Sequence, residues 1–134
     1  MGDILERVRE AVAEQPFMAL LGVSVAYAAP GEVDLELPFD ERFTQQHGFL
    51  HAGAVAAVLD SACGYAAWST ADGDADVLTV EYKINLLEPA VGERVVARGR
   101  VVRRGGRLVV CHGEALADGT LIATSTTTMA LRTR

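Results

Sequence analysis

The residue best suited to chemistry in this sequence is Asp60, the only charge in the apolar stretch from Gly53 to Trp68. This stretch predicts a helix, and a helix that is apolar nearly all round is expected to be buried. Small residues flank Asp60 at helical spacing, whereas the bulky side chains lie on the opposite face. The small neighbours are Ala56, Ala57, Cys63 and Gly64, and the bulky residues are Val55, Val58 and Tyr65. A carboxylate in such a groove is poorly solvated, more basic and a better nucleophile. A core aspartate hydrogen-bonded to a neighbouring strand fits the same pattern.

The composition predicts one domain over residues 1–134, because half of its 134 residues are hydrophobic. The formal net charge of −6 argues against general nucleic-acid binding. Residues 48–71 could span a membrane by length, but they include His51 and Asp60, so we expect no membrane span. Two cysteines without metal-ligand spacing, and no signal-peptide pattern, favour a cytoplasmic protein with reduced thiols. A metal site at His47, His51 and Asp60 is conceivable, but no established ligand spacing supports it, and we expect no metal.

The apolar helix must be positioned by the elements around it. An amphipathic helix is predicted first, with Asp3 as its N-cap and Pro16 at its end. Residues 23–29 and 32–38 predict a hairpin, and residues 40–50 predict a loop that leads to the apolar helix. Four strand-like segments follow that helix, at residues 77–87, 93–103, 107–117 and 120–131. The expected α+β fold is a curved antiparallel sheet wrapped around one long central helix, with a short N-terminal helix.

Two of these strands carry patterns with consequences for packing. In residues 77–87 the apolar side chains alternate along the chain, as in a strand. In residues 107–117 one face carries mostly small residues, which would let a helix approach closely. These are Val109, Cys111, Gly113, Ala115 and Ala117.

The order of elements resembles the hotdog fold. The run from Gln45 through HGFLHAGAVAAVLDSACGYA is similar to acyl-CoA thioesterases of the phenylacetic-acid-pathway type, close to the 4-hydroxybenzoyl-CoA thioesterases. Their signature is a loop amide, a His-Gly-Gly that opens the helix, and an acidic residue nine positions after the His. Here His51-Ala52-Gly53 stands for the His-Gly-Gly, and Asp60 follows His51 by nine positions. The similarity extends to VLTVEYKINLLEPA and VVRRGGRL later in the chain.

This resemblance implies hydrolysis of an acyl- or aryl-CoA thioester, without a cofactor. The backbone N–H of Ala52 and the amide of Gln45 would polarise the carbonyl, and Asp60 would act as general base or nucleophile. Thr79 would help to hold the water. His51 and Gly53 complete the signature beside the substrate, with His51 shaping the loop. Because Ala52 replaces the usual glycine, it adds a methyl group where the substrate approaches.

The hairpin arginines Arg103, Arg104 and Arg107 form the densest basic cluster, and Arg98 and Arg100 point the same way on one strand. The resemblance places this hairpin near the nucleotide of coenzyme A, so the three hairpin arginines are candidates for phosphate contacts. A solvated turn with charged ends is the alternative.

The resemblance also implies a homodimer whose sites each combine residues of two subunits, and further pairing into a dimer of dimers. Two other functions stay open. One is a hotdog hydratase or dehydratase that acts on acyl thioesters without cleaving them, although its His-and-acid motifs are absent from this sequence. The other is an acyl-CoA-binding module without catalysis.

Overall fold

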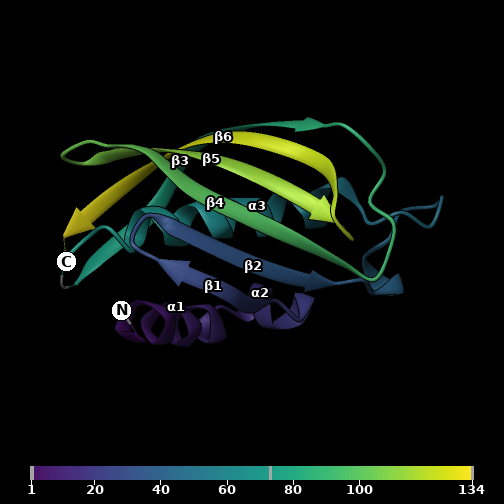
Figure 1. The fold of residues 1–134 in the computed structure, drawn as a ribbon, viewed down its shortest axis with the longest axis horizontal. Coiled ribbons are helices and arrows are strands. Elements are labelled where there is room, and N and C mark those ends of the chain that lie inside the picture. Colours follow the sequence, from purple (N-terminus) through teal and green to yellow (C-terminus); the bar gives the residue numbers. More distant parts are fainter. Residues whose placement is uncertain (1, 73, 134) are drawn as a thin grey trace.

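A computed structural model describes residues 2–72 and 74–133 of the chain (Figure 1). The helical elements are α1 (Gly2–Glu14), α2 (Pro16–Leu21), the 3-10 turn η1 (Glu41–Phe43) and α3 (Ala52–Trp68). The strands are β1 (Ser24–Ala29), β2 (Glu32–Pro38), β3 (Ala75–Leu86), β4 (Arg94–Arg104), β5 (Leu108–Ala117) and β6 (Thr120–Thr133).

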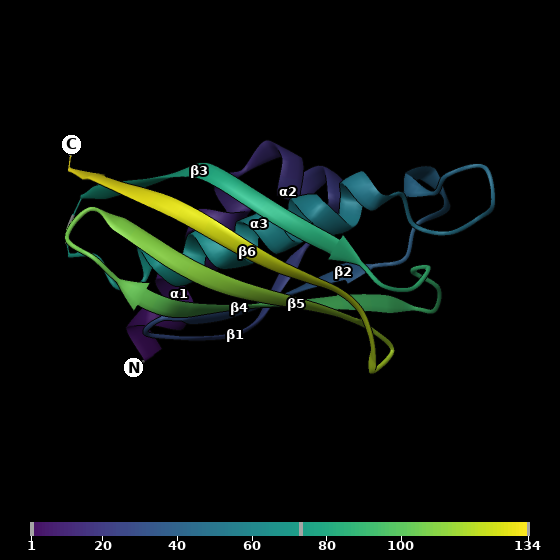
Figure 2. The same ribbon diagram turned by 90° about the horizontal axis from the view of Figure 1, so that it is seen from above.

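The strands form one antiparallel sheet in the order β1-β2-β4-β5-β6-β3. The sheet curves around α3, which packs against its concave face (Figures 1 and 2), while α1 contacts β1 and lies below that strand in the view of Figure 1. The predicted architecture, a curved antiparallel sheet around one long helix with a short N-terminal helix, is confirmed. The central helix begins at Ala52, one residue earlier than predicted.

Small residues let α3 lie close to the middle of the sheet. Gly99 of β4 and Gly113 of β5 are paired across the two strands, directly beneath the helix. A Cβ atom at Gly99 would overlap the carbonyl group of Ala62 in α3, and one at Gly113 would overlap the hydroxyl of Ser125. Gly99 is therefore needed for packing, because the overlap is with the backbone of α3, whereas a Cβ atom at Gly113 would also lie 3.1 Å from the side chains of Cys63 and Leu59 in α3. The predicted role of the small face of β5 is confirmed.

The N-terminal region differs from the prediction at two positions. Asp3 lies inside the first turn of α1 and is not its N-cap. Pro16 does more than end α1, because it opens the second helix α2, in which it occupies the first turn. Proline is favoured there, since its fixed φ suits a helix start and its missing N–H would have had no intrahelical partner.

Strand β3 exposes most of the apolar residues that alternate along it. Leu78, Val80 and Tyr82 are 50–57% exposed. One reason is an irregularity between Thr79 and Glu81, which shifts the register against β6. The other is that β3 pairs only with β6 among the described residues, so it forms an edge of the sheet (Figure 2).

Candidate active site

The start of α3 is organised by His51, which is its N-cap. The Nδ1 atom of His51 accepts a hydrogen bond from the backbone N–H of Gly53 at 2.8 Å. The carbonyl oxygen of His51 accepts the N–H groups of Ala54 and Val55. Within residues 2–72 and 74–133, the N–H of Ala52 donates to no group. A helix start therefore presents one free donor at the positive end of its dipole.

The side-chain amide of Gln45 is oriented by its own loop. Its Oε1 atom accepts the backbone N–H of His47 at 2.6 Å and that of Phe49 at 3.4 Å. The backbone N–H of Gln45 donates to the carbonyl of Phe49 at 2.9 Å, which closes the loop. Because two N–H donors identify the oxygen, the Nε2 group of Gln45 is left to donate elsewhere.

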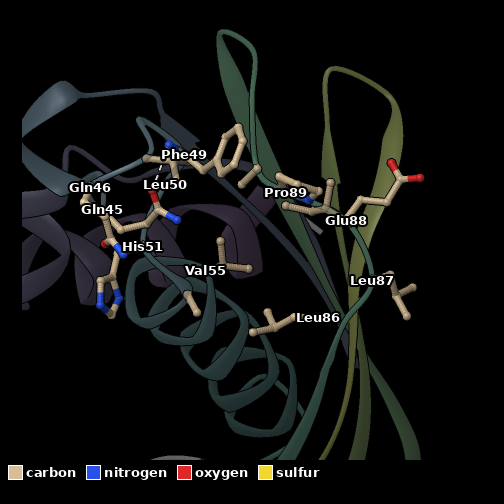
Figure 3. A pocket seen from close by; sticks show the side chains of 13 residues that line it. Gln45, Gln46, Phe49, Leu50, His51, Val55, Leu86, Leu87, Glu88 and Pro89 are labelled. Atoms are coloured by element: carbon tan, nitrogen blue, oxygen red, sulfur yellow. Dashed lines mark hydrogen bonds between the residues drawn. The ribbon is translucent and has the colours of Figure 1, made fainter.

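Gln45 and Ala52 share a pocket of about 450 Å³, the Gln45 pocket, between the start of α3 and the segment after β3 (Figure 3). Val55 and Leu86 lie on facing sides of this pocket, whereas Glu88 points away from it (Figure 3). The lining residues are Gln45, Gln46, Phe49, Leu50, His51, Ala52, Val55, Leu86, Leu87, Glu88, Pro89, Ala90 and Ile122. The Gln45 pocket thus combines two N–H donors, from Gln45 and Ala52, with a mostly apolar lining.

Asp60 lies two turns further along α3 and contacts Thr79 of β3. The hydroxyl of Thr79 donates to Oδ1 of Asp60 at 2.7 Å. Burial raises the pKa of the Asp60 carboxyl above its ordinary value, and the hydrogen bond from Thr79 opposes that shift. Asp60 is therefore a more basic carboxylate than one in water, with one oxygen held by a hydroxyl.

Asp60 lines a second pocket of about 420 Å³, the Asp60 pocket. Its other lining residues are Ala11, Glu14, Gln15, Ser61, Gly64, Tyr65, Trp68, Asp76, Val77, Leu78, Thr79 and Met129. Tyr65 was expected on the face opposite Asp60, and this expectation is wrong because the pocket extends around the helix. Gln15, Tyr65 and Trp68 were not recognised as candidate site residues, since Gln15 lies far from Asp60 in the sequence and reaches the pocket only through packing of α1 and α2.

The predicted site residues therefore fall into separate places within one chain. Gln45, His51 and Ala52 line one pocket, and Asp60 and Thr79 line the other. Ala52 and Asp60 are eight residues apart on one helix, a rise of about 12 Å. A single thioester carbon cannot contact both groups within one copy of the chain.

The hairpin arginines lie at the end of the molecule opposite the Gln45 loop (Figures 1 and 2). Arg103 and Arg107 line a shallow pocket of about 460 Å³ with Gly105, Gly106, Leu108 and Val110. The guanidinium of Arg104 instead donates to carbonyl groups of its own turn. On the same strand, Arg100 pairs with Asp34 at 2.7 Å and Arg98 lies 3.9 Å from the same carboxylate. Of the basic residues on β4 and its turn, Arg103 and Arg107 are thus the better placed for an anion.

Several other features bear on the chemistry. Cys63 and Cys111 are buried free thiols, and burial raises their pKa values to about 11 and about 12, which makes them poor nucleophiles. Among the residues that the structure describes, no group of three or more His, Cys, Asp or Glu side chains could hold a metal ion. None of the helices in the described ranges has both the length and the apolar character needed to span a bilayer.

Comparisons with known proteins show which family this chain belongs to. The sequence profile of the thioesterase superfamily matches residues 47–123, which include the start of α3, Asp60 and Thr79. The chain belongs to the thioesterase superfamily. Thioester hydrolysis is the reaction that this membership assigns to the chain.

Individual relatives agree with the superfamily assignment. The chain is 30% identical over 125 residues to human acyl-coenzyme A thioesterase 13, which covers 90% of this chain and 89% of the human protein. A thioesterase family protein from Silicibacter pomeroyi has 48% identity and a TM-score of 0.93, covering 98% of this chain and 99% of that one. The PaaI protein of E. coli, at 16% identity and a TM-score of 0.87, covers 95% and 91% of the two chains and is similar in fold alone. These likenesses confirm the predicted hotdog fold.

Proposed function

We propose that this protein hydrolyses acyl-CoA thioesters, with Asp60 as general base or nucleophile and the Gln45 pocket as the site that polarises the carbonyl. The observation that carries this proposal is the pair of donors on one pocket, the free N–H of Ala52 and the oriented Nε2 group of Gln45. Two N–H donors that converge on an oxygen stabilise the negative charge that develops there during acyl transfer. The name of the human relative supports acyl-CoA as the substrate.

The carboxylate can act in two ways that the proposal leaves open. In one, Asp60 removes a proton from a water molecule that attacks the thioester carbon. In the other, Asp60 attacks that carbon itself, and water then cleaves the mixed anhydride. Either way the C–S bond breaks and the coenzyme A sulfur takes a proton. The hydroxyl of Thr79 occupies Oδ1 of Asp60, which leaves Oδ2 for the water or the carbon. His51 holds the helix start, with its Nδ1 bound to the N–H of Gly53.

A two-fold dimer would unite the two pockets, with Gln45 and Ala52 of one subunit facing Asp60 of the other. Two features support this arrangement besides the 12 Å rise on one helix noted above. Strand β3 is a twelve-residue edge strand that carries exposed apolar side chains, a combination that proteins normally cover. Asp60 and its neighbours Ala56 and Ala57 are only partly buried in one chain, although α3 is apolar nearly throughout. Further pairing into a dimer of dimers is part of the same proposal.

We further propose that the hairpin arginines contact phosphates of coenzyme A. Arg103 and Arg107 contribute two positive charges to a hollow on an otherwise acidic protein. Such contacts lie far from the reacting carbon, so they would strengthen binding without changing the chemical step.

Release of free thiol from a panel of acyl-CoAs, aryl against straight-chain, tests the activity directly. Asp60→Asn keeps the shape of the side chain and removes its charge, so we expect the variant to fold and turnover to fall by at least about 10²-fold. A folded variant that hydrolyses the best substrate within a few-fold of the parent would show that Asp60 is structural. A hydratase or dehydratase would alter the acyl group without releasing thiol, and a binding module would bind without turnover.

Mixing two inactive variants tests the shared site. Gln45→Ala and Asp60→Asn are unfolded together in equal amounts and refolded. Random pairing makes half of the dimers mixed, and in each mixed dimer one site carries both lesions and the other neither. Recovered activity should therefore approach about a quarter of the parental value in a two-fold dimer. Each variant refolded alone is the control. A mixture no better than the average of the two would show that both residues serve within one chain or that Gln45 is not in the site.

A further inference from the structure

The Asp60 pocket extends well beyond the carboxylate, along α3 towards its C-terminal end. From Asp60 the lining continues through Gly64 and Tyr65 to Trp68. Eight residues of helix give this wall a length of about 12 Å. Val77 and Met129 add apolar surface from the sheet side. A channel of this length and lining is suited to the acyl part of a substrate whose carbonyl carbon lies at Asp60.

A hydrogen-bonded pair forms part of the channel lining beyond Asp60. The Nε2 group of Gln15, at the junction of α1 and α2, donates to the hydroxyl of Tyr65 at 2.7 Å. That hydroxyl donates in turn to the carbonyl of Ala11 at 3.3 Å. Arg7 of α1 stacks over the ring of Trp68 at 4.7 Å from its centroid, which ties α1 to the same end of α3. The N-terminal helices therefore contribute to the wall of this channel.

Gly64 keeps the channel open between Asp60 and this pair. A Cβ atom added there would lie 3.9 Å from Cε and 4.0 Å from Sδ of Met129, which is ordinary contact. Packing therefore does not require glycine at this position, in contrast to Gly99. Glycine in a helix interior is less stable than alanine, so a benefit in packing or stability does not explain it. Its missing side chain instead widens the pocket one turn after Asp60.

We propose that Gly64 and the Gln15–Tyr65 pair set the size of the acyl group that can be cleaved. Gly64 leaves room for an apolar chain or ring beyond the carbonyl, and the pair limits how far that group extends. The polar atoms of the pair are largely engaged with each other and with Ala11, so they offer little to a polar acyl end. The exposed carboxylate of Glu14, which lines the same pocket, disfavours a negatively charged one. This inference rests on the proposed function, since it assigns the Asp60 pocket to the acyl group.

Gln15→Ala enlarges the channel beyond Asp60 with little risk to folding. The side chain of Gln15 makes no capping hydrogen bond to α2, and alanine retains both backbone hydrogen bonds of this residue. Straight-chain acyl-CoAs from acetyl to lauroyl are compared by kcat/KM from thiol release. We expect the optimum to move to longer chains, with at least about a tenfold gain for the first chain that the parent rejects, as one methylene in an apolar pocket can give. Tyr65→Phe removes the same hydrogen bond from the other side and should shift the optimum in the same direction.

Gly64→Ala makes the opposite change. It should lower kcat/KM by about tenfold or more for the longest chains that the parent accepts, and much less for acetyl-CoA. Phe17→Ala is the matched control, because Phe17 is half-exposed on α2 and lines neither pocket. It should leave the chain-length profile unchanged.

The two proposals fail in different ways. If the parent releases thiol but Gln15→Ala and Gly64→Ala keep its chain-length profile, the size limit is refuted and the thioesterase function stands. If the parent releases no thiol, the thioesterase function fails, and S-alkyl-CoA thioethers of rising length, measured by calorimetry, replace the substrates. A length preference in binding that moves with the two variants would support the channel. A preference that does not move would refute it.

Discussion

Ala52→Pro tests the proposed carbonyl-polarising donor by replacing its backbone N–H with a bond to the proline ring. Ala52 is the first helical residue after the N-cap His51, the position at which proline is most readily accepted in a helix. The residue before a proline must be extended, and His51 already is, with φ −60° and ψ 139°. The N–H of Ala52 donates to no other group among the described residues, so its loss breaks no hydrogen bond of the fold. We therefore expect the variant to fold and to keep a melting temperature close to that of the parent.

The expected effect on turnover is large. Removing one donor from an oxyanion site typically lowers kcat by about 10²–10³-fold, or about 2.7–4 kcal/mol of transition-state stabilisation. The loss should fall on kcat more than on KM, because the donor acts on charge that develops during the reaction. The assay is thiol release under saturating and limiting acyl-CoA.

Proline also adds bulk at the helix start, so a control must separate bulk from the missing donor. Ala52→Val enlarges the side chain and keeps the N–H, and Ala52→Gly keeps the N–H with no side chain. We expect the valine variant to change KM and the preference among acyl groups, while kcat for small acyl groups stays within a few-fold of the parent. A proline variant with nearly parental kcat would refute the role of this N–H. A valine variant as slow as the proline variant would attribute the loss to bulk.

Three further predictions follow from the geometry. Because burial raises the pKa of Asp60, this carboxyl favours folding below its unfolded-state pKa and loses that contribution as pH rises through its folded-state pKa. Asp60→Asn should therefore raise the melting temperature at neutral pH. Equal gains at neutral and acid pH would contradict this. Neutral replacements of the hairpin arginines should raise KM for acyl-CoA with little change in kcat, and this increase should shrink with added salt. An equal loss of kcat/KM on a pantetheine thioester, which lacks the nucleotide, would refute phosphate binding. Gly99→Ala should lower stability by about 1–3 kcal/mol or more in denaturant unfolding, because its methyl group would overlap the carbonyl of Ala62. Gly106→Ala is its control, since no atom lies within 4 Å of the added methyl group, and equal losses at both positions would contradict the close packing of α3.

Much of the fold could be predicted because its signals are local. The central helix is apolar nearly all round, and the hairpins are marked by glycine, so both follow from spacing and turn chemistry. The second helix was missed because Pro16 was interpreted only as a helix end, although proline also begins helices. The exposure of β3 could not be predicted from alternation alone. It depends on the position of the strand at the sheet edge and on the irregularity after Thr79, and both are properties of the assembled sheet.

The candidate site likewise includes residues with local sequence signals and residues that only the folded structure brings together. Thr79 was expected beside the catalytic water, and in the structure it contacts Asp60, nineteen residues away in sequence. The Gln15–Tyr65 contact spans fifty residues and joins a helix junction to the last turn of α3. No local pattern marks a glutamine as the partner of a distant tyrosine, so only the packing of the helices shows that both line the Asp60 pocket. Resemblance to a family could suggest candidate reacting groups but not the other residues that line their pockets.

The close packing of α3 on the sheet bears on why the site would need a second chain. Gly99 and Gly113 bring one face of the helix against β4 and β5, which commits that face to the core. The face that carries Asp60 is then turned away from the sheet centre and is only partly covered in a single chain. A raised pKa at Asp60 already reflects this partial burial, and a partner that covered the same face would remove more water from the carboxylate. In the proposed dimer, assembly would therefore do two things at once. It would bring the donors of Ala52 and Gln45 to the carboxylate, and it would make that carboxylate more basic.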